Sequence, residues 1–310
     1  MGDRLKGRVA IVTGAGRGIG RGEALLLAQE GAAVVINDFG GSAAGEGGEQ
    51  TPAQQVCDEI KAMGGKAAAN YGNIADFKTG EELVQQAVSE FGRLDIVVNN
   101  AGILRDRMVF NMAEDEWDSV IAVHLKGHFN LTRAACVVFR QQRSGVIVNT
   151  SSESGLGNMG QANYSAAKEG IIGLTRTVAR DMGRYGVRCN AIRPRAATRL
   201  TISDEMREAA ARGGAAGMNP DLLAAFEKAN PAEAIAPLVV WLCTDEAANV
   251  NGRNFLVTGN QIGLYSEPQV VADIRSDHGW DLDELSKLMP DKVTKDLTNQ
   301  FAPKEEAKTG

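Results

Sequence analysis

The sequence lacks the features that would place it in a membrane, on a nucleic acid or in a secretory pathway. No apolar run approaches the roughly 20 residues of a membrane-spanning helix. The opening Met1-Gly-Asp-Arg does not resemble a signal peptide, and the closing Ala-Lys-Thr-Gly is not a peroxisomal address. Acidic residues outnumber basic ones, 39 against 33, so electrostatics favour neither nucleic acid nor anionic membrane as a partner. We therefore expect a cytoplasmic protein that acts on a small molecule.

Cysteine and histidine are also scarce. The four cysteines form no C-x-x-C pair, and this spacing favours reduced, buried thiols in a cytosolic protein. They are Cys57, Cys136, Cys189 and Cys243. Of the three histidines, His124 and His128 stand one helical turn apart but lack an H-E-x-x-H motif and nearby acidic ligands. We therefore expect no metal site.

Strand-like and helix-like segments alternate along most of the chain. The expected strands cover residues 8–12, 32–38, 66–70, 94–98, 145–150, 186–192 and 254–259, and longer helices are expected near 52–63, 115–142 and 161–183. No internal repeat or linker interrupts the alternation. The pattern predicts one doubly wound α/β domain over residues 1–262, with a seven-stranded parallel sheet. Residues 263–310 form a polar C-terminal extension with one amphipathic stretch near Trp280, and we expect its last ten or so residues to be loose.

Glycine is abundant, and its most informative cluster joins the first strand to the first helix. The cluster reads T-G-A-G-R-G-I-G and contains Gly14, Gly18 and Gly20. Such glycines let the backbone approach a diphosphate at the helix N-terminus, where amide groups and the helix dipole favour negative charge. The spacing is G-x3-G-x-G and not the usual G-x-G-x-x-G, and a glycine turn formed for packing alone is the alternative.

The second strand ends in Asp38, about twenty residues further on. A carboxylate there can accept hydrogen bonds from the adenosine ribose, and its charge repels a 2′-phosphate, so it favours NAD over NADP. Arg17 in the glycine turn is a counter-signal because it can reach a phosphate, and a loop-capping role for Asp38 is the alternative. The glycine-rich insertion at residues 40–52 is expected to be mobile.

Two later strand ends carry short polar and small residues. Asn73 and Ile74 follow the third strand and are positioned to flank an adenine. Asn100, Ala101 and Gly102 belong to N-N-A-G after the fourth strand, where the main chain can pass close to a cofactor. Residues 195–230 are rich in Ala and Gly, which predicts a mobile helix and loop over the site.

The stretch from Ser151 to Lys168 carries the chemistry. Helical spacing places Tyr164 and Lys168 on one helix face, while Ser151 follows a buried strand. An ammonium beside a phenol lowers the phenol pKa, and such a phenol can exchange a proton with a substrate hydroxyl or carbonyl. The pair alone is a weak signal, because many solvated helix faces carry the same spacing.

Together these motifs resemble the short-chain dehydrogenase/reductase family over about residues 5–262. The glycine turn, N-N-A-G, Ser151 and Y-S-A-A-K occur in that family's order and spacing. The resemblance implies a Rossmann fold, Tyr164 as the acid/base, Lys168 as its pKa modifier and ribose ligand, and Ser151 as the partner of the reacting oxygen. It also implies cofactor contacts from Ile19, Pro194 and Thr198, the last to the nicotinamide carboxamide. Arg195 stands where most of the family has glycine, so the local backbone there differs from the family pattern.

A difference from the family pattern at residue 124 points to one subgroup of the family. His124 stands where the family usually carries a catalytic asparagine, and both a catalytic and a structural role remain open. The sequence resembles one subgroup that carries the same histidine, the (3R)-hydroxyacyl-CoA dehydrogenases of multifunctional enzyme type 2, also called 17β-hydroxysteroid dehydrogenases. Two further segments carry this resemblance, V-V-I-N-D-F-G-G and N-A-G-I-L-R-D-R. The resemblance implies hydride transfer between NAD and a 3-hydroxyacyl-CoA, and the substrates it implies include CoA thioesters with a bulky or steroid-derived acyl group.

Alternatives remain open at this point. They are a free hydroxysteroid dehydrogenase, an acyl-carrier-protein ketoreductase, which normally prefers NADP, and a non-catalytic dinucleotide-binding protein. Five arginines are candidates for CoA phosphate contacts, and the alternative for each is a solvated surface charge or an ion pair: Arg105, Arg107, Arg193, Arg195 and Arg199. By analogy with the family we expect a homodimer or homotetramer that pairs the helices at 115–142 and 161–183.

Overall fold

The computed structural model of the chain describes residues 2–48, 50–202 and 220–302. The chain divides into two compact units, Met1–Tyr265 and Ser266–Gly310. The sequence analysis predicts a boundary at residue 262.

The first unit is built on one sheet of eight strands. The strands are β1 (Val9–Thr13), β2 (Ala33–Asn37), β3 (Lys66–Asn70), β4 (Ile96–Asn99), β5 (Gly145–Thr150), β6 (Val187–Pro194), β7 (Asn254–Val257) and β8 (Ile262–Leu264). Their order is β3-β2-β1-β4-β5-β6-β7-β8. The first seven pair in parallel, as the sequence predicts, and β8 pairs antiparallel with β7. The expected count of seven was one short, because β8 has three residues and follows β7 through a tight turn.

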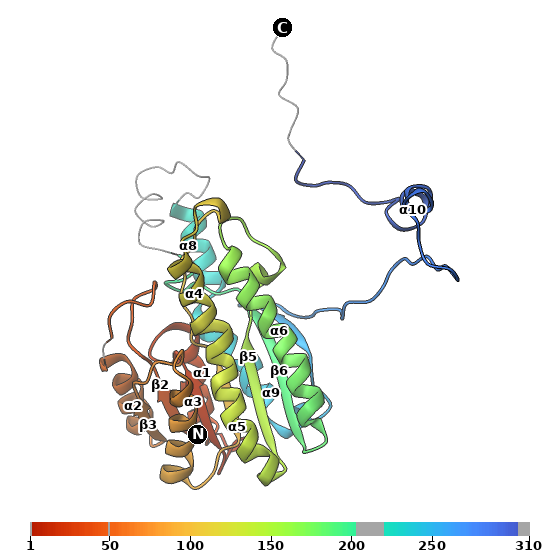
Figure 1. The fold of residues 1–310 in the computed structure, drawn as a ribbon. Coiled ribbons are helices and arrows are strands. Elements are labelled where there is room, and N and C mark those ends of the chain that lie inside the picture. The colour runs from red at the N-terminus through yellow and green to blue at the C-terminus, as the bar shows by residue number, and fades with distance from the viewer. Residues whose placement is uncertain (1, 49, 203–219, 303–310) are drawn as a thin grey trace. The chain divides into compact units, whose positions relative to one another are not determined.

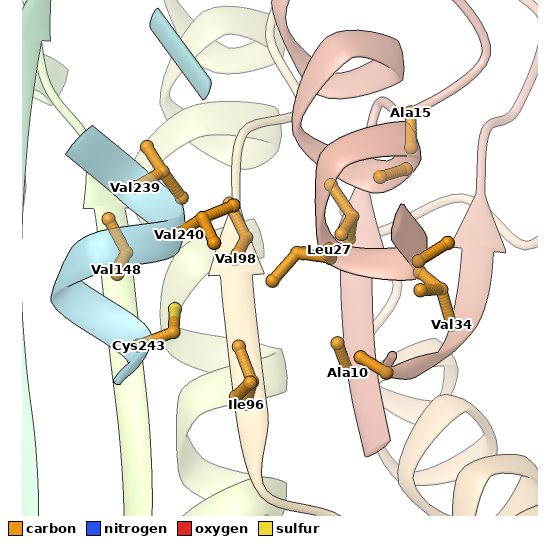
Figure 2. Packing of buried hydrophobic residues seen from close by; sticks show 14 of the residues in the cluster. Ala10, Ala15, Leu27, Val34, Ile96, Val98, Val148, Val239, Val240 and Cys243 are labelled. Carbon is orange, nitrogen blue, oxygen red and sulfur yellow. The ribbon is translucent and has the colours of Figure 1, made fainter. Parts of the chain in front are cut away.

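Helices cover both faces of this sheet (Figure 1). The helices in the described part of the first unit are α1 (Gly18–Gln29), α2 (Thr51–Ala62), α3 (Phe77–Phe91), α4 (Glu114–Ile121), α5 (Gly127–Gln142), α6 (Ala162–Gly183), α8 (Pro220–Ala229) and α9 (Ala236–Cys243). Successive strand residues point to opposite faces, so Val12 packs with α1, α2 and α9, whereas Ile11 packs with α3, α5 and α6. Figure 2 shows the first of these layers, with Leu27 and Val239 against Val98 and Val148. Burial on both faces explains why the central strands are continuous apolar runs.

The segment expected to be one long helix at 115–142 is helical but not uniform. A π-helical turn, Ala122–Lys126, separates α4 from α5. Such turns widen a helix locally and often occur at functional sites. This one holds His124, which is 1% exposed.

The strand order reverses between β1 and β4, since the chain runs outward to β3 and then returns to the other side of β1. In open α/β sheets, ligands bind beyond the carboxyl ends of the strands at this switch point. The fold therefore brings the ends of β1, β2, β4 and β5 around one crevice.

The second unit contains a short helix, α10 (Leu282–Leu288), followed by a π-helical turn, Met289–Val293. The helix begins at the expected amphipathic stretch, and the Asp281 side chain caps it by accepting from the Glu284 amide at 2.8 Å. Across the described ranges of both units, no helix has the length and apolar character needed to cross a membrane.

Candidate functional site

Two adjoining cavities lie at the carboxyl edge of the sheet. The first, of about 600 Å³, is lined by the glycine turn, the end of β2 and N-N-A-G. The second, of about 570 Å³, is lined by Ser151, Tyr164, Lys168 and His124. Ile19, Asn100, Gly102 and Thr198 belong to the walls of both. A ligand that spans the two would place one end beside Tyr164.

The glycine turn and N-N-A-G brace each other. Gly14 adopts φ +62°, and a Cβ at this position would stand 2.7 Å from the Cα of Ala101. The Asn100 Nδ2 group donates to the carbonyls of Thr13 and Gly14, each at 3.1 Å. The turn therefore needs glycine for close backbone packing, and it presents main chain to the first cavity.

Most residues predicted to contact a cofactor line the first cavity. They are Gly14, Arg17, Gly18, Ile19, Asp38, Asn73, Ile74, Asn100, Ala101, Gly102 and Thr198. Tyr164, Lys168 and Pro194 line the second cavity instead. Gly20 is buried beneath the turn, where a Cβ would stand 2.5 Å from the Gly14 carbonyl oxygen, so its contribution is to packing.

Asp38 is held firmly at the end of β2. One carboxylate oxygen accepts from the Gly16 amide at 2.8 Å, and the other accepts from the Gly40 amide at 2.7 Å. Arg199 and Arg17 are close enough to interact electrostatically, and burial together with Arg17 lowers the pKa of Arg199. Each carboxylate oxygen keeps a lone pair for a further donor, so Asp38 both caps the loop and can accept ribose hydroxyls.

The second cavity brings the three predicted catalytic side chains together. Ser151 directly follows β5, and its hydroxyl donates to the Lys168 carbonyl at 2.7 Å. The Lys168 ammonium donates to the Thr150 carbonyl at 2.6 Å and lies 5.4 Å from the centre of the Tyr164 ring. Since Tyr164 and Lys168 are one turn apart on α6, the helix itself fixes their relative position.

The net shift of the Tyr164 pKa is upward, whereas the sequence analysis predicts a lowering by Lys168. Burial raises the pKa of Tyr164 to about 12, with the negative charge of Asp106 adding to the effect and a hydrogen bond from Ser152 opposing it. Burial also lowers the pKa of Lys168 to about 7. Lys168 is buried and Tyr164 is half-buried at the cavity wall, and loss of water is the largest cause of both shifts.

The Ser152 hydroxyl is a site residue that the sequence reasoning missed. It hydrogen-bonds the Tyr164 phenol and lowers its pKa, and it also accepts from the Ser154 amide at 3.1 Å. The only signal in the sequence was its place directly after Ser151. A turn of serine and glycine residues does not reveal which hydroxyl faces the phenol.

His124 lies against Tyr164, in an edge-on contact with ring centres 5.0 Å apart. Its Nε2 is 2.8 Å from the Ile103 carbonyl oxygen and 3.1 Å from the Ile103 amide. Burial and the nearby Lys168 charge hold the pKa of His124 well below its usual value, so the ring is neutral at physiological pH. Nε2 is engaged with the main chain, whereas Nδ1 is buried and has no hydrogen-bond partner among the described residues.

The five arginines considered for CoA phosphates are engaged within the chain. Arg105 pairs with Glu46 and Asp115, Arg107 with Glu116, Arg193 with Glu169, Arg195 with Glu153, and Arg199 donates to the Gly41 carbonyl. The ion-pair alternative therefore fits four of the five. The charges of these four are matched by carboxylates, whereas Arg199 contacts a carbonyl and lines both cavities.

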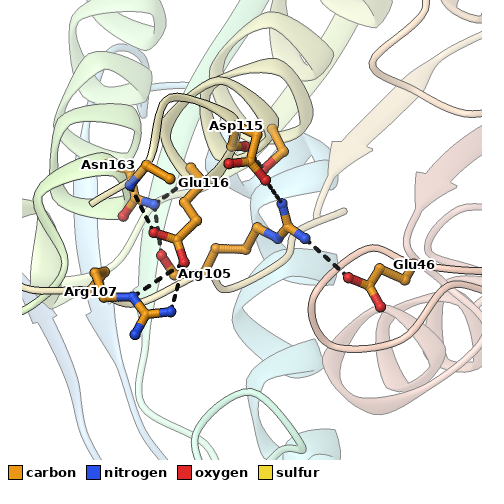
Figure 3. A network of polar contacts seen from close by, with 8 residues as sticks. Glu46, Arg105, Arg107, Asp115, Glu116 and Asn163 are labelled. Carbon is orange, nitrogen blue, oxygen red and sulfur yellow. Dashed lines mark hydrogen bonds and ion pairs between the residues drawn. The ribbon is translucent and has the colours of Figure 1, made fainter. Parts of the chain in front are cut away.

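The glycine-rich insertion, expected to be mobile, is attached beside the first cavity. The Ala43 carbonyl accepts from the Leu104 amide at 2.9 Å. Figure 3 shows Glu46 from this insertion paired with Arg105, which also reaches Asp115. These contacts join the insertion to the chain that leaves N-N-A-G. Of the other segment expected to be mobile, 195–230, residues 203–219 lie outside the described ranges.

Metal ligation was not expected, and the part of the chain that the structure describes holds no group of three or more His, Cys, Asp or Glu side chains suited to a metal ion. All four cysteines, which lie within the described ranges, are free thiols.

Comparison with known proteins agrees with the fold and the motifs. A sequence model of the family described as short chain dehydrogenase matches residues 8–209. The hydroxyacyl-CoA dehydrogenase ChsB1 of Mycobacterium tuberculosis is 45% identical over 301 residues, which cover 93% of this chain and 89% of that protein. The peroxisomal multifunctional enzyme type 2 of Drosophila melanogaster is 47% identical over 250 residues, 80% of this chain but 38% of that protein.

Solved structures give the same result. A short chain dehydrogenase from Mycobacterium avium superimposes with a TM-score of 0.78 at 43% identity, covering 94% of this chain and 96% of that one. The full-length Drosophila multifunctional enzyme gives a TM-score of 0.72 at 33% identity, with 93% of this chain but 45% of that one covered. The chain therefore belongs to the short-chain dehydrogenase family and is an oxidoreductase that acts on CH–OH groups with a nicotinamide dinucleotide.

Proposed function

We propose that the protein transfers hydride reversibly between NAD and the 3-hydroxyl group of a 3-hydroxyacyl-CoA. The observation that carries the proposal is the joint placement of Ser151, Tyr164 and Lys168 in a cavity that opens into a dinucleotide-sized cleft. The substrate class rests on the 45% identity to ChsB1 across almost the whole length of both proteins. The chain spans 33% to 52% of the length of the peroxisomal multifunctional enzymes it matches, so their other activities carry no weight here.

The first cavity fits a nicotinamide dinucleotide. At the start of α1, Gly14 and Gly18 have no side chain that would separate the main chain from the cavity. A helix N-terminus that is open in this way favours binding of a diphosphate. Asp38 would hold the adenosine ribose, and Asn73 and Ile74 would flank the adenine. When bound, NAD would supply the hydride acceptor and, in its oxidised form, a positively charged ring.

The chain's own residues supply the proton chemistry. In the oxidative direction, deprotonated Tyr164 takes the proton of the substrate hydroxyl. Ser152 donates a hydrogen bond to the phenolate. The Ser151 hydroxyl, which donates to the Lys168 carbonyl at 2.7 Å in this structure, would turn to donate to the reacting oxygen of the substrate. Lys168, held by the Thr150 carbonyl, offsets part of the phenolate charge. His124 and Gly102 close the wall behind Tyr164.

The preference for NAD is tested by Asp38→Asn. The change removes the charge but keeps one acceptor for the loop amides, so we expect the ratio of kcat/KM for NAD to that for NADP to fall by about 10-fold or more. Steady-state kinetics with both cofactors measure this ratio. Asp58→Asn, on the exposed side of α2, is the control and should leave it unchanged. An unaltered ratio in Asp38→Asn would remove the charge argument for NAD.

The substrate proposal is tested by oxidation of 3-hydroxyacyl-CoA thioesters of several chain lengths, with a free 17β-hydroxysteroid as the competing substrate. We expect turnover with NAD on at least one thioester and a kcat/KM at least about 10-fold higher than on the steroid. Turnover on the steroid alone would keep the mechanism and replace the substrate. No turnover on any alcohol, with NAD still bound, would favour the non-catalytic reading.

A second candidate substrate is a 3-oxoacyl group on acyl carrier protein. The reductase FabG of Staphylococcus aureus, named for that substrate, is 40% identical over 260 residues and matches across 97% of its length. Asp38 weighs against this candidate if the reaction requires NADP, because a carboxylate repels the 2′-phosphate. Reduction of acetoacetyl thioesters of CoA and of acyl carrier protein, side by side, separates the two.

We also propose a homodimer or homotetramer formed through α5 and α6. Phe129 and Val137 on α5 are 45% and 44% exposed, which is unusual for large apolar side chains on one helix.

The four free thiols further support a cytoplasmic location, where cysteines stay reduced.

A further inference from the structure

Arg193 is the largest of the fully buried side chains in the described chain, at 2% exposure. It lies near the end of β6, and two of its nitrogens have separate partners. Nη1 donates to the Ser152 carbonyl at 2.8 Å, and Nη2 donates to the Glu169 carboxylate at 2.6 Å. The guanidinium also lies over the Tyr265 ring, 5.1 Å from its centre. A buried charge is costly unless it is paired in this way.

The partners of Arg193 are the residues next to the catalytic ones. Ser152 follows Ser151 at the end of β5, and Glu169 follows Lys168 on α6. One planar guanidinium therefore connects the two elements that carry the catalytic serine and lysine. The neighbouring main chain adds a further tie, since the Ser151 amide donates to the Ile192 carbonyl at 2.8 Å.

The link continues to the reacting phenol through Ser152. Its carbonyl is held by Arg193, while its hydroxyl hydrogen-bonds Tyr164 and lowers the Tyr164 pKa. The carbonyl and the hydroxyl belong to one residue, so we expect a displaced carbonyl to shift the hydroxyl relative to the phenol. There is little space around the Arg193 guanidinium, since a Cβ at Gly155 would stand 3.1 Å from the Arg193 Nη1 atom.

We propose that Arg193 is a positioning residue for the hydride-transfer reaction: it sets the Ser151–Ser152 turn against Lys168 and acts on Tyr164 through the Ser152 hydroxyl. The inference rests on the proposed function for its reaction, but not on the identity of the substrate. A guanidinium suits this role because its fixed fork reaches two acceptors at a defined angle, whereas an ammonium acts as a point charge.

The first test is the pH dependence of alcohol oxidation in Arg193→Met and Arg193→Lys. Displacement of the catalytic groups in Arg193→Met is expected to lower kcat by about 10- to 100-fold, with KM for NAD nearly unchanged. Loss of the Ser152 hydrogen bond is expected to move the midpoint of the rate profile upward by about one pH unit. Arg193→Lys keeps the positive charge and an N–H donor group, so its kcat should lie between those of Arg193→Met and the wild type.

Arg188→Met is the matched control. Arg188 lies on the same strand, and its guanidinium donates to the Leu242 and Thr244 carbonyls at 2.8 and 2.9 Å, away from the two cavities. This variant should keep the wild-type pH profile even if it is less stable. Equal changes in Arg188→Met and Arg193→Met would overturn the proposal, and so would a wild-type kcat and midpoint in Arg193→Met.

A second readout needs no substrate. In protein labelled with ¹³C at the tyrosine ζ carbon, the Tyr164 resonance is assigned by its loss in Tyr164→Phe. We expect Arg193→Met and Ser152→Ala to move that resonance in the same direction, and the double variant to match the Ser152→Ala variant alone. Additive shifts, or no shift in a folded Arg193 variant, would show that Arg193 does not act through Ser152. If no thioester is oxidised, the proposed reaction fails while this spectrum still decides the role of Arg193.

Discussion

Replacing Tyr164 with phenylalanine is expected to lower kcat for alcohol oxidation by about 10³-fold or more, with NAD binding retained. The variant keeps the ring that packs edge-on against His124, so the cavity wall keeps its shape. It loses the only phenol among the residues lining the second cavity, and with it the group that exchanges the substrate proton. Steady-state oxidation of the preferred thioester measures the loss, and titration of NAD by calorimetry measures cofactor binding.

Tyr185→Phe provides the control for this comparison. Tyr185 also carries a positioned phenol, which accepts from Arg184 at 2.8 Å, but it lies near the end of α6 away from both cavities. We expect its kcat and KM to stay within about twofold of wild type, as for a surface substitution of small energetic effect. A Tyr164→Phe enzyme that keeps a tenth or more of the wild-type rate would remove Tyr164 as the acid/base.

The fold and the placement of the catalytic residues could be predicted because they depend on local patterns. Apolar strands with glycine or polar residues at their ends place Gly14, Asp38, Asn100 and Ser151 at one edge of a parallel sheet. The helical repeat then fixes Tyr164 relative to Lys168. Each inference needs only the chain's periodicity and the rule that parallel strands end on the same side.

Features that depend on contacts between distant segments could not be predicted. The partners of Arg105 come from residue 46 and residue 115, and those of Arg193 come from β5 and α6. No local pattern connects these positions. The sign of the Tyr164 pKa shift failed for a related reason: the sequence shows that Lys168 is near, but only the structure shows how much water both groups lose.

Glu23 is a second buried charge that no sequence pattern indicated. It lies on α1 at 0% exposure, and neither carboxylate oxygen has a hydrogen-bond partner in the part of the chain that the structure describes. Burial raises its pKa from 4.5 to about 8. Cys243 on α9 is close enough to interact with it, and Glu23 in turn contributes to the raised pKa of that thiol. At neutral pH the folded protein therefore holds Glu23 protonated.

This arrangement predicts that stability falls as pH rises. The unfolded chain releases the Glu23 proton near pH 4.5, while the folded chain keeps it until about pH 8. The contribution of the Glu23 proton to the free energy of unfolding is therefore complete below pH 4.5, and it is lost progressively as the pH rises through about 8. The full difference corresponds to roughly 5 kcal/mol in the free energy of unfolding, an upper bound because a local opening of α1 can admit water.

Glu23→Gln removes the titration while keeping the shape of the side chain, and Glu23→Met also removes the unpaired polar group. We expect both variants to be more stable than wild type at pH 8–9, with an advantage that shrinks toward pH 5. Denaturant unfolding at matched protein concentration across this range measures the effect, and Glu82→Gln on the exposed face of α3 is the control. Parallel stability curves for wild type and Glu23→Gln would show that Glu23 finds water or a partner in the folded protein. A difference that grows with pH would identify the proton on Glu23 as part of the native structure.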